Sequence, residues 1–152
     1  MSKLQIITYP NDILRKKSKS IEIFNIDKYQ KFIDDMIEIM VAKDGVGLAA
    51  PQVGYNVNII VVNKDILNTD DFIVLCNPKI TFLSAKKIEI EEGCLSLPGT
   101  YGNVKRPEKI RIKAFNRKGA EIIIKAKGIM ARVIQHEIDH LLGVLFIDKL
   151  EK

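Results

Sequence analysis

Near its C-terminus the chain reads Gly128-Ile129-Met130-Ala131-Arg132-Val133-Ile134-Gln135-His136-Glu137-Ile138-Asp139-His140. Positions four apart on an α-helix differ by about 40° of rotation and about 6 Å of rise, so His136 and His140 would project from one face. The apolar residues before them recur at the spacing of a core-facing helix: Ile129, Met130, Val133 and Ile134. We therefore expect a buried helix over residues 129 to 142, ended by Gly143, with two histidines side by side.

These histidines can bind a metal ion. They are the only two in the chain, and both fall in the same short motif. A third ligand is available in the thiolate of Cys94, which lies in Glu92-Gly93-Cys94-Leu95-Ser96. One thiolate and two imidazoles leave a fourth position for water, which is typical of catalytic zinc-type sites and not of closed structural ones. The pattern indicates hydrolysis, with Glu137 turned towards the open side of the ion and Glu92 as a hydrogen-bonding partner that orients the site.

The composition fits an intracellular protein. The 152 residues, 47% of them apolar, suit one compact domain spanning residues 1–152. We find no secretory signal and no run that could cross a membrane, so we expect no membrane partner. Two cysteines do not make a disulfide framework, which leaves Cys94 free for metal and Cys76 as a buried apolar filler. The net charge of +5 is spread along the chain without interleaved aromatic residues, so we expect no specific nucleic-acid partner.

The remaining sequence predicts an α+β fold. Apolar residues at helical spacing predict a long amphipathic helix over residues 27 to 42, with Asp27 as its N-cap. Strand-like runs follow at residues 58–63, 72–76, 80–83, 88–92, 109–115 and 121–126, with a hairpin turn at 116–119. We expect mostly antiparallel sheets packed around the central metal-binding helix, with the second long helix near the N-terminus.

A segment rich in small residues, 45–52, follows the first predicted helix. Taken alone it reads as a glycine turn, because no strand precedes it to make a phosphate loop. Its last residue, Gln52, is more informative. A neutral amide can donate a hydrogen bond to a developing oxyanion without competing for the ion, and the backbone N–H of Leu95 can supply a second donor.

Three motifs together make the chain resemble the peptide deformylases, which remove the formyl group from the N-terminal methionine of new polypeptides. The patterns GxGxAAxQ, EGCxS and HExDH match residues 45–52, 92–96 and 136–140, in the order and spacing of that family. The opening segment 9–18 and residues 132–135 are also similar to it. The resemblance covers nearly the whole chain.

The resemblance implies a role for each motif. Cys94, His136 and His140 would hold one divalent ion, natively Fe²⁺, which Zn²⁺, Ni²⁺ or Co²⁺ can replace in this family. Glu137 would act as general base and then as general acid, while Gln52 and the Leu95 amide would stabilise the oxyanion. The substrate, an N-formylmethionyl nascent peptide, would occupy a cleft lined by Val46, Gly47, Glu92, Gly93, Ile129 and Val133, with His136 beside the methionine side chain.

The chain departs from the family pattern in two places. Tyr101 stands where some bacterial members carry an arginine that helps fix the EGCxS loop, whereas Arg106 does match. The chain also ends twelve residues after His140, while many bacterial members continue into a C-terminal helix that docks on the ribosome. We therefore expect weakened ribosome docking. The resemblance further implies a monomer in the cytoplasm, or in the stroma or matrix of an organelle if a transit segment is removed.

Two other functions compete with this one. A metalloendopeptidase of the HExxHxxGxxH class would need a third histidine where Phe146 stands, and a third carboxylate ligand would have to come from Asp148 or Glu151 near the end of the chain. A metal-bound module without turnover would have no use for Glu137. Cleavage of internal peptide bonds would favour the peptidase, and an inert metal without bound water would favour the module.

Overall fold

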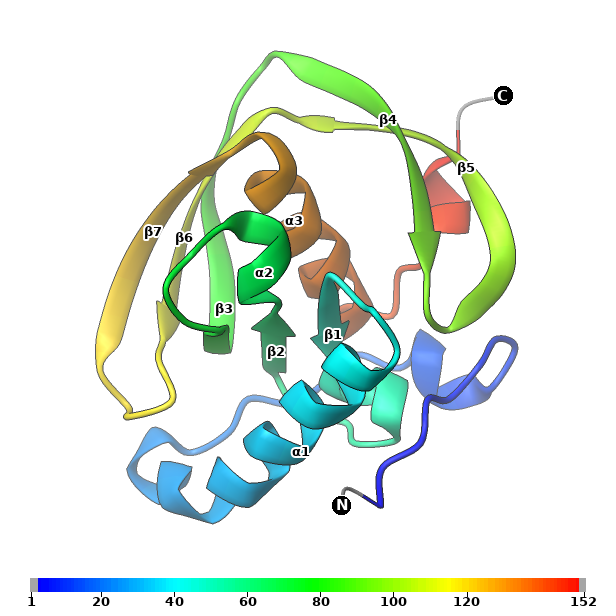
Figure 1. Cartoon of the computed structure of the whole chain (residues 1–152). Coiled ribbons are helices and arrows are strands. Elements are labelled where there is room, and N and C mark those ends of the chain that lie inside the picture. The colour runs from blue at the N-terminus through cyan, green and yellow to red at the C-terminus, as the bar shows by residue number, and fades with distance from the viewer. Residues whose placement is uncertain (1–2, 151–152) are drawn as a thin grey trace.

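The computed structural model describes residues 3–150, and two antiparallel sheets enclose its C-terminal helix (Figure 1). The larger sheet has five strands in the order β1-β2-β3-β6-β7, and the smaller one is the hairpin of β4 and β5. Their bounds are β1 Gly47–Ala49, β2 Ile59–Val62, β3 Ile73–Leu83, β4 Lys87–Cys94, β5 Leu97–Pro107, β6 Lys109–Phe115 and β7 Glu121–Lys127. The helices are α1 Gln30–Ala42, α2 Lys64–Leu67 and α3 Gly128–Leu141, with 3₁₀ segments at Asp12–Arg15, Ile23–Tyr29, Ala50–Val53 and Phe146–Lys149.

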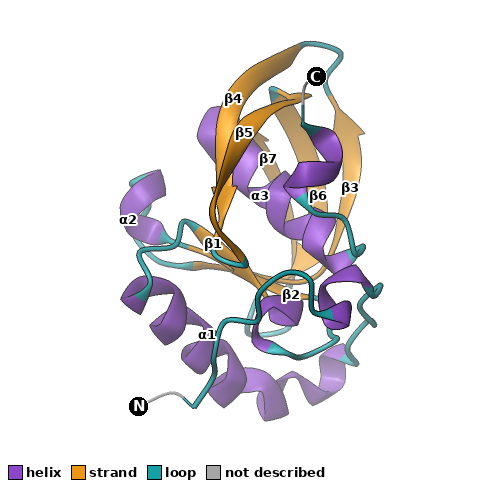
Figure 2. Ribbon diagram, turned by 90° about the vertical axis from the view of Figure 1, so that its right-hand side faces the viewer, coloured by secondary structure: helices purple, strands orange, loops and turns teal. Residues whose placement is uncertain are grey.

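Helix α3 runs between the five-stranded sheet and the β4–β5 hairpin (Figure 2). Its apolar side packs on the large sheet, in one buried cluster with alternate residues of β6 and β7. That cluster includes Ala131, Ile134 and Ile138 from α3 and Ile110 and Ile112 from β6. The alternation of buried and exposed residues along β6 places every second side chain against the helix. The predicted α+β fold, with antiparallel sheets around a central helix, is confirmed.

The N-terminal helix begins later than predicted. Helix α1 starts at Gln30, its N-cap is Tyr29, and no side chain caps it. The prediction of Asp27 as the N-cap is wrong, because Asp27 lies inside the preceding 3₁₀ segment and its carbonyl accepts a hydrogen bond from the backbone N–H of Gln30. Ile26 is buried in the core beneath α1, so packing keeps the chain helical through Asp27.

The runs predicted at residues 72–76 and 80–83 form one strand instead of two. β3 is continuous but changes register between Cys76 and Lys79. At this bulge Asn77 has a φ of 51°, and its side-chain amide exchanges two hydrogen bonds of 2.9 Å with the backbone of Ile21. The polar pair Asn77 and Pro78 reads as a break in the sequence, but the bulge absorbs it without ending the strand.

Three elements were not predicted. The short strand β1 lies where a glycine turn was expected, and α2 is a single turn. β5 is an eleven-residue strand that contains two glycines and exposes the polar or charged residues Thr100, Asn103 and Lys105. Because β5 has little apolar alternation, its order comes from pairing with β4. The predicted turn is confirmed: Gly119 has a φ of 84°, and Asn116 Oδ1 accepts from the N–H of Lys118 and Ala120.

Within residues 3–150, no helix combines the length and apolarity needed to cross a bilayer. Helix α3 ends close to the predicted boundary, and Gly143 just beyond it has a φ of 76°. A side chain at Gly143 would also collide with the backbone of Arg15. Glycine is therefore required at this position both by the left-handed backbone and by close approach of the N-terminal segment.

Candidate active site

The three predicted metal ligands meet at the junction of the hairpin and α3. Cys94 ends β4, while His136 and His140 lie one turn apart on α3. One ligand atom from each residue lies within 4.8 Å of the other two, and Cys94 Sγ is 3.3 Å from His140 Nε2. The four-residue spacing thus places both histidines on one side of α3, as predicted. Pairing of β4 with β5 brings the thiol of Cys94 to the same point.

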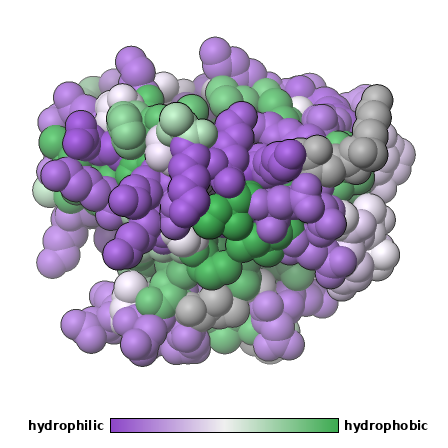
Figure 3. All heavy atoms as spheres, turned by 90° about the horizontal axis from the view of Figure 1, so that it is seen from above, coloured by the Kyte–Doolittle hydropathy of each residue, from purple (hydrophilic) through white to green (hydrophobic). Residues whose placement is uncertain are grey.

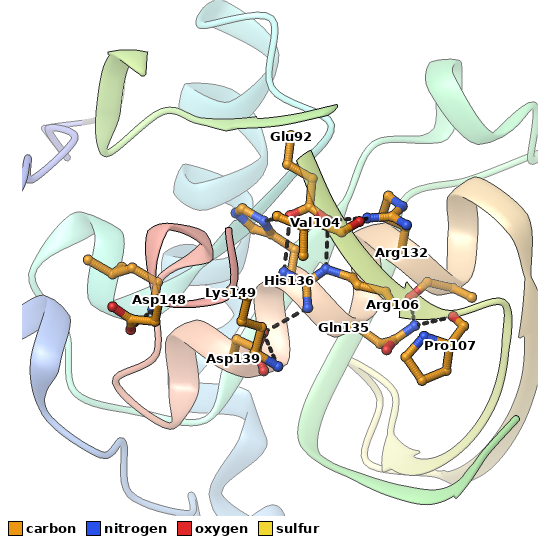
Figure 4. A network of polar contacts seen from close by, with 12 residues as sticks. Glu92, Val104, Arg106, Pro107, Arg132, Gln135, His136, Asp139, Asp148 and Lys149 are labelled. Carbon is orange, nitrogen blue, oxygen red and sulfur yellow. Dashed lines mark hydrogen bonds and ion pairs between the residues drawn. The ribbon is translucent and has the colours of Figure 1, made fainter. Parts of the chain in front are cut away.

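His136 is oriented by the carboxylate of Glu92, which lies in the middle of the polar network in Figure 4. His136 Nδ1 is 2.9 Å from Glu92 Oε1. Burial alone would raise the pKa of Glu92, but hydrogen bonds from His136 and Arg106 outweigh it and lower the pKa to about 2. Because an ionised carboxylate only accepts, Nδ1 carries a proton, and Nε2 is the nitrogen left for the ligand cluster once a cation displaces its proton.

Two buried arginines hold Glu92 in place. Arg106 donates from Nε and Nη2 at 2.6 and 3.0 Å, and Arg132 donates from Nη1. Arg106 also reaches Asp139 at 2.8 Å, and Arg132 donates to the carbonyl of Val104 at 3.0 Å (Figure 4). Two guanidinium groups therefore face two carboxylates in a nearly dry environment, and Lys149 also reaches Asp139 at 3.3 Å.

Sequence reasoning assigned no role to Arg132 or Asp139, although both lie in the segment that decided the fold. Their positions carry a usable signal. Arg132 is four residues before His136 and Asp139 is three residues after it, so all three lie along one side of α3. Charged side chains on the ligand-bearing side of a buried helix indicate partners across the interface. Here Arg132 pairs with Glu92, and Asp139 pairs with Arg106.

The two histidines differ in the hydrogen bonding of Nδ1 and in the direction of their pKa shifts. Burial lowers the pKa of His136, but hydrogen bonds to Cys94 and Glu92 outweigh this and raise the pKa to about 10. The pKa of His140 is well below its usual value, because it is buried and lies beside His136. Its Nδ1 is buried without a hydrogen-bond partner among the residues that the structure describes. Thus His140 offers a neutral imidazole, whereas a cation would have to displace a proton from His136.

Glu137 lies beside this cluster, and one oxygen of its carboxylate makes no hydrogen bond within the described residues. The side chain is 3% exposed, and its Oε1 has no partner in residues 3–150. Burial raises the pKa of Glu137 to about 7. The other oxygen lies against Gly47, where a Cβ atom would come within 2.8 Å of it. Glu137 can therefore take up and release a proton near neutral pH.

Gln52 is held with its amide nitrogen towards the ligands. Its Oε1 accepts from the backbone N–H of Ala49 at 2.9 Å, so the amide must turn Nε2 the other way. Nε2 lies 3.2 Å from Ser96 Oγ and 3.5 Å from Cys94 Sγ. The sequence did not single out Ser96, the last residue of the Cys94 motif, as a partner of Gln52.

A cleft of about 620 Å³ opens onto these groups. All six predicted substrate-binding residues line it, as do Gln52, Leu95 and Glu137. Seen from above, apolar side chains form a band that is flanked by polar ones (Figure 3). Glu92 lines the cleft too, but its carboxylate is occupied by His136, Arg106 and Arg132, which makes it an orienting group and not a group free to bind substrate.

Tyr101, one of the two predicted departures from the family pattern, lies at the rim of the cleft. Its ring lies on Gly93, where a Cβ atom would come within 2.6 Å of the ring. The side chain is 66% exposed and lines the cleft. Arg106 and Arg132 hold Glu92 without any contribution from Tyr101.

The residues named for a peptidase alternative do not join the ligands. Phe146 is buried, and its ring stacks on His136 with centroids 6.1 Å apart. Asp148 pairs with Arg15 at 2.6 Å, and Glu151 lies outside the described residues. Among residues 3–150, one group of histidine, cysteine and acidic residues is close enough to share an ion, namely Cys94, His136 and His140. This soft and borderline donor set suits a divalent transition metal.

Comparisons with known proteins agree with this geometry. The chain is 49% identical over 151 residues to a peptide deformylase of Thermodesulfovibrio yellowstonii, covering 99% of this chain and 90% of that protein. It is 44% identical to the chloroplastic peptide deformylase 1B of Oryza sativa subsp. japonica, covering 97% of this chain but only 55% of the plant protein, so it spans about half of that relative. The crystal structure of peptide deformylase from Thermotoga maritima superposes with a TM-score of 0.93 at 36% identity and full coverage of both chains. The family described as polypeptide deformylase matches residues 3–152, and the chain therefore belongs to this family of metal-dependent hydrolases.

Proposed function

We propose that this chain hydrolyses the formyl group from the N-terminal formyl-methionine of nascent polypeptides and releases formate. One observation carries the proposal: Cys94, His136 and His140 converge at a cleft beside the unpaired carboxylate of Glu137. When bound there, a divalent cation supplies Lewis acidity, which makes water a better nucleophile near neutral pH. The family membership and the full-length similarity support the same reaction.

Glu137 moves the proton. Its carboxylate accepts a proton from the attacking water, and oxygen then bonds to the formyl carbon. When the bond between carbon and nitrogen breaks, Glu137 returns the proton to the departing amine, which leaves formate and a free α-amino group. A pKa near 7 suits both halves of this transfer.

Gln52 and Leu95 stabilise the negative charge that develops on the formyl oxygen. Because Ala49 fixes the Oε1 end of the Gln52 amide, Nε2 is directed to the ligand side before substrate arrives. The backbone N–H of Leu95, at the turn between β4 and β5, is the second donor in this proposal. Donors that are already oriented cost little reorganisation during the reaction.

The methionine side chain occupies the apolar part of the cleft, beside Val46, Gly47, Ile129 and Val133. Gly47 keeps the Glu137 carboxylate accessible, since a larger residue would collide with both Glu137 and Val133. An unbranched thioether fits such a slot well because it adapts to irregular apolar surfaces. The backbone of Gly93, under Tyr101, completes the rim.

We also propose Fe²⁺ as the native ion, with Zn²⁺, Ni²⁺ or Co²⁺ able to replace it. The thiolate selects transition metals over Mg²⁺ and Ca²⁺, which supports this class of ion. Residues 1–152 would act as one catalytic domain and as a monomer, in the cytoplasm or in an organelle's stroma or matrix. The substrate is the formylated end of a nascent chain.

The experiment measures formate released from formyl-Met-Ala-Ser by protein purified anaerobically with Fe²⁺, with metal content determined on the same sample. The Cys94→Ser variant should lose most metal and most turnover, because a serine hydroxyl stays protonated where a thiol ionises on a metal. Cys76→Ala is the matched control, since Cys76 is buried in the core and outside the ligand group. Unchanged metal and turnover in Cys94→Ser would remove Cys94 from the site.

Substrate choice separates deformylation from peptidase action. A blocked peptide with internal bonds but no formyl group should be left intact, while formyl-Met peptides lose formate. Equal cleavage of both would favour the endopeptidase instead. A protein that holds its metal but releases no formate from any peptide would be a non-catalytic metal module.

A further inference from the structure

Basic side chains gather on the face of the large sheet that turns away from α3, over β3, β6 and β7. Figure 1 shows these three strands side by side. Burial alternates along β6 and β7, so the residues between the core positions point outward. Six of these outward residues on three strands are basic: Lys79 on β3, Lys109, Arg111 and Lys113 on β6, and Lys125 and Lys127 on β7. We call this surface the basic face.

Strand register places these cations directly opposite one another. Lys79 pairs with Lys113, Arg111 with Lys125, and Lys109 with Lys127. Like charges at directly opposed positions of antiparallel strands destabilise a sheet. In the part of the chain that the structure describes, only Lys113 of the six has an ion-pair partner, the exposed Glu121 at 3.4 Å. The fold therefore keeps two such pairs, Arg111 with Lys125 and Lys109 with Lys127, without an internal counter-charge, while Glu121 offsets the third only in part.

Protection of an exposed sheet edge explains only part of this pattern. β7 is an edge strand, and lysines on an edge discourage pairing with another chain. That reason covers Lys125 and Lys127. It does not cover Lys79, Arg111 and Lys113, which lie on the interior strands β3 and β6. An external polyanion would relieve the repulsion on all three strands.

An aromatic side chain lies among the cations. Phe82 is opposite Arg111 in the register, is 48% exposed, and has the Arg111 guanidinium 5.8 Å from its ring centroid. Cations that follow a phosphate backbone, combined with an exposed ring on which a base can stack, are typical of surfaces that bind RNA without reading its sequence. The individual segments did not predict this, because Phe82, Arg111 and Lys125 are far apart in the chain and meet only through strand pairing.

We propose that the basic face binds the phosphate backbone of RNA, without sequence specificity. The choice of RNA rests on the deformylase function proposed above, since a nascent chain is still attached to an RNA-rich particle. An anionic membrane fits less well. Interfacial binding uses a continuous apolar surface that enters the lipid, whereas here Phe82 and Ile123 are surrounded by cations on a sheet.

The experiment compares two variants that each remove four positive charges and so lower the formal net charge from +5 to +1. The first is Lys79→Gln/Lys109→Gln/Arg111→Gln/Lys125→Gln on the basic face. The matched control is Lys16→Gln/Lys17→Gln/Lys19→Gln/Lys105→Gln, at exposed positions outside the large sheet. Affinity for a short single-stranded RNA and for an RNA duplex is measured over a range of salt concentrations, together with formate release from formyl-Met-Ala-Ser.

The basic-face variant should bind RNA about tenfold or more weakly at moderate salt. The slope of log K against log salt should decrease in magnitude by roughly 3, because each lost phosphate contact removes about 0.7 to 0.9 from it. The control should retain most of the affinity, and turnover on the free peptide should be parental in both variants. Peptide turnover reports on the proposed function separately, so its absence in all three proteins would count against that function and not against the basic face.

Three outcomes would overturn the proposal. Equal loss of RNA binding in both variants would show that net charge alone is responsible. Unchanged binding in the face variant would place RNA elsewhere. Tighter, face-dependent binding to phosphatidylserine vesicles or to polyglutamate than to RNA at the same salt would assign the surface to a membrane or to an acidic protein.

Discussion

Two buried glutamates lie close to the ligand cluster, yet their surroundings give them opposite properties. Glu92 is 7% exposed and Glu137 is 3% exposed, so burial does not distinguish them. Hydrogen bonds from His136 and Arg106 lower the pKa of Glu92 to about 2, against the effect of burial. Burial without such bonds raises the pKa of Glu137 to about 7. Partners, and not depth, decide which carboxylate stays ionised.

The difference matches two kinds of task. Glu92 keeps a constant charge, so it can hold His136 in one tautomer and one orientation throughout a reaction. Glu137 changes protonation near neutral pH and has an oxygen with no partner within residues 3–150, so it can accept a proton and return it. Exchange of these environments would harm both functions, and variants can test each half of the comparison.

The largest effect is expected for Glu137→Gln. The amide has nearly the same shape but can neither accept nor return a proton, so kcat should fall by about 10² to 10⁴. Metal content should stay parental, because Glu137 is not in the ligand group. Steady-state formate release and metal analysis on one sample measure both quantities. Glu89→Gln on the exposed side of β4 is the control and should keep its turnover. A Glu137→Gln protein with full metal and near-parental kcat would exclude Glu137 as the proton carrier.

A second test removes one partner of Glu92. Arg132→Met keeps much of the side-chain length but leaves a buried carboxylate short of one cation, which typically costs about 3 to 5 kcal/mol in unfolding free energy. Urea denaturation monitored by circular dichroism measures the change. Lys105→Met, at an exposed position of β5, should change stability by less than about 0.5 kcal/mol. If Arg132→Met were as stable as that control, the ion network would not contribute to the fold.

The sequence predicted one side of α3 better than the other. Helical spacing identified Val133 and Ile134 as core, and the motif identified His136 and His140, because both signals depend on positions within one helix. The core-facing prediction was wrong for Ile129, which is 49% exposed and lines the cleft. The ions on the same helix could not be predicted in this way. Arg132 pairs with Glu92 and Asp139 pairs with Arg106. These partners lie on β4 and β5, far from α3 in the sequence.

The same limit explains the errors in strands. β6 alternates regularly, and its bounds agree with the prediction. Apolar and polar residues do not alternate along β5, so hydrophobic periodicity could not identify it as a strand. Its pairing with β4 holds it in place. The bulge at Asn77 depends on Ile21, more than fifty residues earlier. Signals local to a segment were sufficient for α3 and β6, whereas contacts between distant segments were needed for β5 and the bulge.

The third test uses pH, and its sign follows from the lowered pKa of Glu92. The unfolded carboxyl has its ordinary pKa of 4.5, and the folded one has a pKa of about 2. The stabilisation is therefore complete above the unfolded value and is lost as pH falls from 4.5 through 2, amounting to roughly 3 kcal/mol.

Glu92→Gln should remove this pH-dependent part. Unfolding free energies of the parent and the variant, measured at a series of acidic pH values, should converge as the pH falls. The variant is less stable at neutral pH because its arginines lose a counter-charge, but its curve should be flatter. Glu89→Gln, exposed on the same strand, should follow the parent's curve. Parallel curves for the parent and Glu92→Gln would show that Glu92 is not ionised in the way that its contacts indicate.

The smallest effect is expected for an exposed carboxylate with an equally good partner. Asp148 accepts from Arg15 at 2.6 and 3.1 Å, a bidentate geometry similar to that of Arg106 on Glu92, but both side chains are 39% exposed. Water already solvates these charges and salt screens them, so the coupling in a double-mutant cycle of Arg15→Gln and Asp148→Asn should be about 1 kcal/mol or less. The cycle is measured by urea denaturation at low and at high salt, and the coupling should shrink at high salt. A salt-insensitive coupling as large as the effect of Arg132→Met would mean that geometry, and not burial, sets the strength of ion pairs in this protein.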